Sequence, residues 1–185
     1  AYAATLWVSK NAEKLGGNPH KIAVGGDSAG GNLATAVTLM AKERNNLNLV
    51  YQLLLYPVTN YNFNTDSYQK FAKGFGLRKS EMIWFWDHYL ESSEAGKNPF
   101  ASPLQAKDLK NLPPAHIITA EYDVLASEGE AYAKRLQEAE VSVSFKCYLG
   151  MIHGFLGLPQ LSSLANHALR EIAEKLALAF DDSDE

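Results

Sequence analysis

The sequence predicts an α/β fold, in which a parallel sheet carries helices on its faces. Short apolar runs, suited to buried strands, alternate with longer segments whose apolar residues recur every three or four positions, as in amphipathic helices. Strands separated by helices need crossover connections, and such crossovers make parallel sheets. The 185 residues, 46% hydrophobic and 21% charged, suit one globular domain with a sizeable core.

The expected strands are short apolar runs that end at turn residues. They cover residues 22–24, 49–56, 115–120 and 141–149. The first ends at Gly25-Gly26 and the second at Pro57, because glycine and proline interrupt regular structure. We expect the four strands to form a parallel sheet in sequential order.

The expected helices fill the intervals before and between these strands and close the chain. They cover residues 6–15, 29–44, 126–139 and 161–180. Gly16-Gly17 follows the first helix, as is typical of a helix C-terminus. The second helix should turn one apolar face to the core, formed by Leu33, Ala36, Val37 and Met40. The acidic stretch Asp181–Glu185 is interpreted as a solvated tail.

Residues 58–112 lose the alternating rhythm and mix polar with aromatic residues. A helical patch at Met82–Leu90 contains the aromatic run Trp84-Phe85-Trp86, which we expect to pack as part of a helix. The segment is therefore interpreted as a cap-like insertion within a single catalytic domain of residues 1–185. The chain opens without Met, already inside an apolar pattern of helical spacing, so we expect this domain to be incomplete at its N-terminus.

Composition excludes several classes of partner. A net charge of −4 gives no reason to expect nucleic acid or an anionic membrane, both of which select basic surfaces. The longest apolar run is too short to span a bilayer, and the single cysteine, Cys147, excludes an internal disulfide framework. A small neutral substrate and a reducing compartment, the cytoplasm, are the default expectations.

A Gly-x-Ser-x-Gly pentapeptide, residues 26–30, lies between a predicted strand and a predicted helix. A strand that turns sharply into a helix strains its corner residue, and small neighbours such as Gly26 and Gly30 relieve the crowding. The turn lifts the Ser28 hydroxyl above the sheet, where it can act as a nucleophile. The helix N-terminus supplies the Ala29 N–H as an oxyanion donor. The alternative is a glycine-rich turn in which Ser28 only caps the helix.

Two further residues complete a catalytic triad. A serine nucleophile needs a base, and the base needs an acid that fixes its tautomer. Asp123 follows the third strand and His153 follows the fourth, in the order serine, acid, histidine. All three therefore belong to the carboxyl edge of the sheet, where open α/β sheets bind ligands.

Other titratable residues fit structural roles better. His20, His88, His116 and His167 fall before a strand, in the insertion, at the wrong end of a strand and within a helix. Asp27 adjoins the nucleophile in a tight turn, so it cannot orient a base that arrives from another strand. Cys147 alternates with apolar residues of the fourth strand, and we expect it to be buried.

Five stretches resemble the hormone-sensitive-lipase-like carboxylesterases, the bacterial family IV, in that family's order. They are Gly25–Ala34, Asn98–Leu104, Leu112–Ala115, Glu121–Asp123 and His153–Phe155. The resemblance runs the length of the chain and implies the α/β-hydrolase fold. It also implies hydrolysis of short- to medium-chain acyl esters through an acyl-enzyme on Ser28, with His153 as base and Asp123 as acid. In that family the segment matching residues 58–112 contributes to a cap over the pocket.

The sequence departs from that family in two ways. Val124 stands where the family usually has proline after the catalytic aspartate. The family's upstream His-Gly-Gly-Gly oxyanion motif and its N-terminal strands are absent from this sequence. We therefore expect the 185 residues alone to be nearly inactive. We also expect them to form a homo-oligomer, or to associate through an open sheet edge.

The chemistry predicted is acyl transfer to water with no metal and no organic cofactor. Two alternatives remain open. One is a peptidase or amidase, because these activities share the fold and the triad. The other is a non-catalytic ligand receptor of the same family, of the kind that arises in plants through loss of the histidine, although His153 is retained here.

Overall fold

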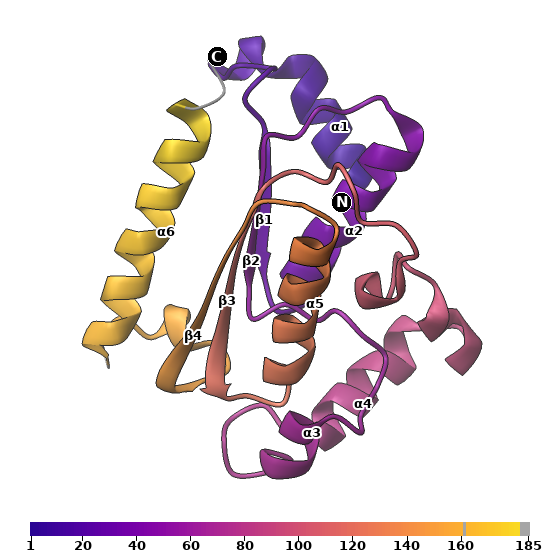
Figure 1. The fold of residues 1–185 in the computed structure, drawn as a ribbon, viewed down its shortest axis with the longest axis vertical. Helices are drawn as coiled ribbons and strands as arrows, with labels where there is room; N and C mark the ends of the chain where they lie inside the picture. Colours follow the sequence, from indigo (N-terminus) through magenta and orange to yellow (C-terminus); the bar gives the residue numbers. More distant parts are fainter. Residues whose placement is uncertain (161, 182–185) are drawn as a thin grey trace.

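The computed structural model describes residues 1–160 and 162–181. At its centre is a parallel four-stranded sheet in the order β1-β2-β3-β4 (Figure 1), as the sequence predicted. The strands are β1 (Ala23–Asp27), β2 (Tyr51–Leu55), β3 (Ala115–Tyr122) and β4 (Val143–Ile152). Within the described residues β1 pairs only with β2, so it forms one edge of the sheet.

Helices cover both faces of this sheet. The α-helices are α1 (Tyr2–Asn11), α2 (Ala29–Arg44), α3 (Asp66–Lys70), α4 (Lys79–Tyr89), α5 (Ala126–Glu138) and α6 (Ser163–Asp181). Figure 1 views the sheet nearly edge-on, with α2 and α5 on one side of it and α6 on the other. Short 3₁₀-helices join them, at Glu13–Leu15, Ser93–Lys97, Pro103–Gln105 and Phe155–Gly157. None of the helices in the described ranges is long and apolar enough to cross a membrane.

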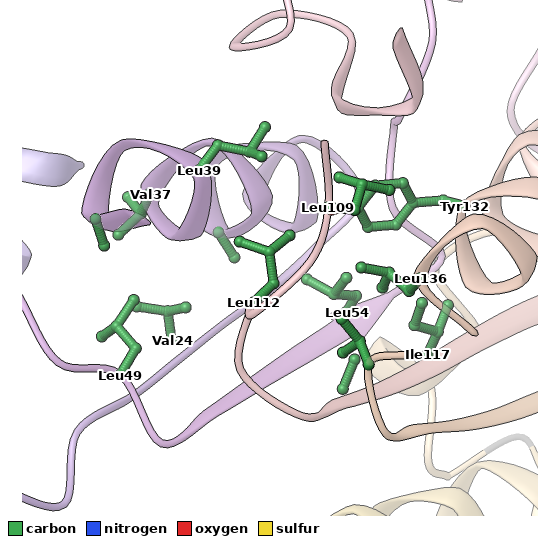
Figure 2. Close-up of a cluster of buried hydrophobic side chains, with 14 of the residues drawn as sticks. Val24, Val37, Leu39, Leu49, Leu54, Leu109, Leu112, Ile117, Tyr132 and Leu136 are labelled. Carbon is green, nitrogen blue, oxygen red and sulfur yellow. The ribbon is translucent and has the colours of Figure 1, made fainter. Parts of the chain in front are cut away.

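The larger core lies between the sheet and helices α2 and α5. Figure 2 shows Leu54 of β2 and Ile117 of β3 pointing towards Tyr132 and Leu136 of α5. Leu112, from the loop that precedes β3, fills the space towards α2. A second cluster on the opposite face joins Tyr56, Ile118 and Tyr148 to the buried side of α6. The sheet is thus fixed from both sides.

The strands reach further towards their carboxyl ends than the apolar runs suggested. Pairing continues to Asp27 opposite Leu55, and to Tyr122 opposite Ile152. These terminal residues include glycine and polar groups, so a hydrophobic pattern does not reveal them. Conversely, β2 ends one residue before Tyr56, whose φ of 36° departs from strand geometry.

The helix boundaries agree with the predictions except near the ends. α1 ends at Asn11, and a 3₁₀ turn carries the chain to Gly16, whose left-handed φ of 79° closes it. The predicted closing helix began at residue 161, which lies outside the described residues, as do residues 182–185 of the predicted acidic tail. Asp181 belongs to α6.

Two burial predictions are wrong. Leu33 is 42% exposed, whereas the polar Asn32 on its neighbouring face is buried. The reason is that the Asn32 amide donates to the carbonyls of Val58 and Ala101, which bring loops against that side of α2. Cys147 is exposed as a free thiol in the middle of β4, an edge strand within the described residues. On its face of the strand Val143 and Phe145 pack against the core, whereas from Cys147 to Leu149 the core no longer covers this face.

The segment of residues 58–112 folds into α3, α4 and two 3₁₀-helices. In Figure 1, α3 and α4 lie at the carboxyl edge of the sheet. The predicted helical patch corresponds to α4. Of its three consecutive aromatic residues, Trp86 is buried, whereas Trp84 and Phe85 are 57% and 49% exposed. The expected packing role therefore holds for Trp86 alone.

Candidate active site

Ser28 occupies a strained turn between β1 and α2. Its φ of 54° and ψ of −116° lie outside the regions that a non-glycine residue ordinarily adopts. The Ser28 N–H donates to the Leu55 carbonyl at 2.9 Å, which extends the β1–β2 ladder into the turn. The side chain makes no capping bond to α2 within the described chain, so the alternative reading as a simple N-cap fails.

Two positions around this turn have no room for a side chain: Gly26 in β1 and Gly31 in the first turn of α2. A Cβ on Gly26 would lie 2.3 Å from the Gly30 carbonyl carbon. The same addition at Gly30 meets nothing closer than 3.8 Å, so Gly30 does not relieve crowding through its own missing side chain. Gly31, which sequence reasoning did not single out, approaches Pro57 so closely that a Cβ would lie 2.8 Å from the proline ring.

His153 links the serine to a carboxylate. Its Nε2 lies 2.9 Å from Ser28 Oγ, and its Nδ1 lies 2.7 Å from Asp123 Oδ2. A carboxylate can only accept, so Nδ1 carries the proton and Nε2 accepts from the serine hydroxyl. His153 follows β4 directly, and Gly154 beside it adopts a left-handed φ of 75° that turns the chain back.

Asp123 is held in place by its own loop. The carboxylate is 1% exposed, and Oδ1 accepts the Leu125 N–H at 2.9 Å while Oδ2 faces the imidazole. A local turn bond and a bond to the base therefore coexist on one side chain. Because both oxygens are engaged, the carboxylate has little freedom to rotate away from His153.

Ala29 is the first residue of α2 and is exposed beside the serine. A helix leaves its first N–H groups without intrahelical partners, and they carry the positive end of the helix dipole. This position is suited to an anion that develops next to Ser28 Oγ.

An apolar cavity of about 450 Å³ opens beside the serine. Its lining residues come from the elbow, from α2 and from the segment of residues 58–112: Ser28, Ala29, Asn32, Leu33, Val58, Leu77, Met82, Phe85, Trp86 and Tyr89. Leu33, which the sequence assigned to the core, therefore lines this cavity instead. From α4 the cavity takes Met82, Phe85, Trp86 and Tyr89, so one side of this helix faces the cavity.

Sequence reasoning missed Glu128, a buried carboxyl group close to the triad. Glu128 is 1% exposed, and its Oε1 accepts the N–H groups of Thr59 and Asn60 at 2.7 and 3.2 Å. Burial raises its pKa to about 8, against the opposing effect of those two donors. A signal was available, because Glu128 falls on the buried stripe of α5 with Tyr132 and Leu136 at four-residue spacing.

The other histidines occupy the structural positions expected. His116 is fully buried at the start of β3, where Nδ1 donates to the Ser144 carbonyl, and burial lowers its pKa. His88 donates within α4 to the carbonyl of Trp84. Asp27 is exposed at the end of β1, and the imidazole of His153 is bonded to Asp123.

Comparison with known proteins agrees with this geometry. The model of a family described as the alpha/beta hydrolase fold matches residues 1–157. The chain belongs to this family. Among alpha/beta hydrolases, the carboxylic ester hydrolase LipN of Mycobacterium tuberculosis is 40% identical over 95% of this chain and 48% of its own length. An arylesterase of Saccharolobus solfataricus is 40% identical over 87% of this chain and 53% of its own. The resemblance to hormone-sensitive-lipase-like carboxylesterases is confirmed.

Solved alpha/beta hydrolases have the same fold. A thermostable esterase from Pseudomonas putida superposes with a TM-score of 0.94 at 44% identity, covering 97% of this chain and 57% of that one. An esterase of the fungus Rhizomucor miehei gives 0.94 at 42% identity, covering 98% of this chain and 58% of that one. The chain thus spans about half the length of the curated relatives it matches.

Proposed function

We propose that the protein is a serine carboxylesterase that hydrolyses short- to medium-chain acyl esters. Ser28 is the nucleophile, His153 the base and Asp123 the acid that orients it. The observation that carries the proposal is the continuous chain of hydrogen bonds from Ser28 Oγ through the imidazole to Asp123, at 2.9 and 2.7 Å. A serine hydroxyl is a weak nucleophile, and a base that is oriented by a carboxylate activates it.

The reaction follows from these contacts. Ser28 Oγ attacks the ester carbonyl carbon as Nε2 of His153 takes the hydroxyl proton. The carbonyl electrons move onto oxygen and return as the alkoxide leaves, taking the proton from the imidazolium. Asp123 stabilises the imidazolium through Nδ1 without becoming protonated. Water then attacks the acyl-enzyme by the same steps and releases the carboxylic acid and free Ser28.

The oxyanion of each tetrahedral intermediate forms beside the N-terminus of α2. Ala29 is the first residue of α2, so its N–H has no partner within the helix and donates to the oxyanion. By resemblance, a His-Gly-Gly-Gly motif supplies further donors in related enzymes, and this sequence lacks that motif.

Substrate class follows from the cavity. Apolar side chains of α2 and α4 dominate its lining, so it suits an uncharged ester with an aliphatic or aromatic group. The printed names of the relatives, a carboxylic ester hydrolase and an arylesterase, favour esters over the amide or peptide alternative. Retention of a histidine bonded to the serine disfavours a non-catalytic receptor.

Three further features belong to the same proposal. Residues 58–112 act as part of a cap over the cavity, supported by the cavity-lining side of α4. The protein resides in the cytoplasm, since its exposed free thiol at Cys147 suits a reducing compartment. It associates with itself or another chain through the β1 edge, where strand groups lack a neighbour within the described residues.

The test is labelling of the intact protein with a fluorophosphonate, followed by peptide mass spectrometry. We expect one modified residue, Ser28, and loss of both labelling and hydrolysis of p-nitrophenyl esters in Ser28→Ala. Ser127→Ala is a suitable control because its hydroxyl accepts the N–H of Ser67 in the structure, away from the triad bonds. Labelling at another residue, or full turnover by Ser28→Ala, would contradict the assignment. Faster cleavage of matched anilides than of esters would favour the amidase alternative.

A further inference from the structure

Tyr56 stands out as a second strained residue at the carboxyl edge of the sheet. It follows β2 as Ser28 follows β1, and its φ of 36° is unfavourable for a bulky side chain. Such strained geometry persists only where the surroundings enforce it, most often at functional sites. The Tyr56 N–H donates to the Ile118 carbonyl at 2.6 Å, so the strained backbone is anchored to β3.

The consequence of this conformation is the position of the tyrosine ring. The ring is 2% exposed and meets the imidazole of His153 edge to face, with centroids 4.9 Å apart and planes at 61°. On its other side lies Phe155, at 6.0 Å between centroids. Phe155 in turn lies 5.3 Å from Tyr148, whose hydroxyl donates to Glu171 of α6. A series of aromatic contacts therefore connects the imidazole of His153 with α6.

We propose that Tyr56 is a positioning residue that holds the His153 imidazole in the plane joining Ser28 to Asp123. Two hydrogen bonds fix the direction of an imidazole, but they leave it free to tilt about the line between its nitrogens. The Tyr56 ring packs against one side of the imidazole and restricts this tilt. The proposal rests on the proposed function, because it assigns a role within the same triad.

The hydroxyl group is not the active part of Tyr56. Burial, with the nearby carboxylates of Asp27 and Asp123, raises its pKa to about 12. Tyr56 is therefore neutral over the pH range in which an esterase triad works, and it can neither serve as a base nor carry charge to His153. Its contribution comes from the ring, and phenylalanine should replace it.

The experiment compares Tyr56→Phe with Tyr56→Leu in the intact, active protein. We expect Tyr56→Phe to keep kcat within about threefold. Tyr56→Leu should lower kcat on the order of 10- to 100-fold with KM nearly unchanged, as expected for misplacement of a catalytic group. Fluorophosphonate should label Ser28 more slowly in Tyr56→Leu by a similar factor, because that reaction needs the base but no ester. Tyr56→Met replaces the leucine variant if the latter does not fold.

Tyr51→Leu is the matched control. Tyr51 is the first residue of the same strand, is 7% exposed and lies at the end away from the triad. Tyr51→Leu should be less stable than wild type but should keep the wild-type kcat. Equal losses of kcat in Tyr51→Leu and Tyr56→Leu, wild-type kcat in Tyr56→Leu, or an equally damaging Tyr56→Phe would each overturn the proposal. Failure of the proposed function is distinct, because it appears as full turnover by Ser28→Ala.

Discussion

Thr59 donates two hydrogen bonds to Glu128, one to its side chain and one to its backbone. The Thr59 N–H donates to Glu128 Oε1 at 2.7 Å, and Thr59 Oγ1 donates to the Glu128 carbonyl at 2.9 Å. Glu128 lies in the first turn of α5, which follows the loop of Asp123. Thr59 lies where the chain leaves the sheet after β2. The start of the segment of residues 58–112 is thereby tied to the helix that follows the loop of Asp123.

This buried carboxyl should make stability depend on pH. Its folded pKa is raised to about 8 from a reference value of 4.5, so between these values the folded chain keeps a proton that the unfolded chain releases. Stability therefore falls as pH rises through this window, by at most about 1.4 kcal/mol per pH unit for this one group. Glu128→Gln cannot ionise, so it should gain stability relative to wild type from pH 5 to pH 8.

Urea unfolding of both proteins at several pH values measures this difference. Glu130→Gln, on the exposed side of the same helix, is the control for removing a carboxylate from α5. An equal relative gain in Glu130→Gln, or no change with pH in Glu128→Gln, would contradict the assignment of the proton to Glu128.

Asp123→Asn should abolish most activity while leaving the fold intact. The amide oxygen can still accept the Leu125 N–H, so the loop keeps its turn bond. The amide nitrogen then faces His153 Nδ1 and favours the tautomer in which Nε2 carries the proton and cannot accept one from Ser28. Turnover should fall on the order of 10⁴-fold, as is seen when a triad histidine has the wrong tautomer.

Steady-state hydrolysis of p-nitrophenyl acetate, with circular dichroism to check folding, measures the effect. Asp87→Asn, on an exposed position of α4, is the matched control and should keep its activity. A loss in Asp87→Asn comparable to that in Asp123→Asn would mean that the acid comes from the 58–112 segment.

Gly26→Ala should be far more damaging than Gly30→Ala, although both belong to the same pentapeptide. The Gly26 methyl would meet backbone atoms of Gly30 at 2.3–2.9 Å, and backbone cannot move aside as a flexible side chain can. We expect a loss of at least about 3 kcal/mol in the free energy of unfolding. A Cβ at position 30 would lie 3.8 Å from Asp27 Oδ1, an ordinary contact distance, and alanine favours the helix, so stability should stay equal or rise by up to about 1 kcal/mol. Thermal unfolding of the two variants measures the difference in stability. Equal losses of stability would contradict the inference that the close approach of Gly26 to the Gly30 backbone excludes a side chain.

The difference between these glycines illustrates what sequence could and could not provide. The proximity of Ser28, Asp123 and His153 was predictable because strand ends in a parallel sheet meet at one edge, so three residues distant in sequence could be placed together. Leu33 was misassigned, because periodicity identifies an apolar face but not whether that face meets the core or a cavity beneath another segment. Cys147 was misassigned for a related reason, since an outer strand is covered by its helix over only part of its length. The strain at Tyr56 has no sequence signal, since it depends on the bond to β3.

The final prediction concerns the 185-residue chain by itself. Ile22 and Ser28 flank β1 and form their bonds with β2 through the Ile22 carbonyl and the Ser28 N–H. Bonding directions alternate along a strand, so the Ala23 N–H points to the open edge. We expect this edge to pair with a second copy, which light scattering would detect as a dimer or larger species. Ala23→Pro removes an outward donor and should shift the material towards monomer.

This chain should also hydrolyse esters at a small fraction of the rate of the relatives of about twice its length. The Ala29 N–H is its one assigned oxyanion donor, and loss of a single donor typically costs about 10² to 10³ in kcat. Ser28→Ala in the same chain gives the background from contaminating esterases. Turnover by a monomeric preparation near that of the relatives of about twice its length would mean that these residues already contain a complete oxyanion site. In that case donors other than the Ala29 N–H must lie among them.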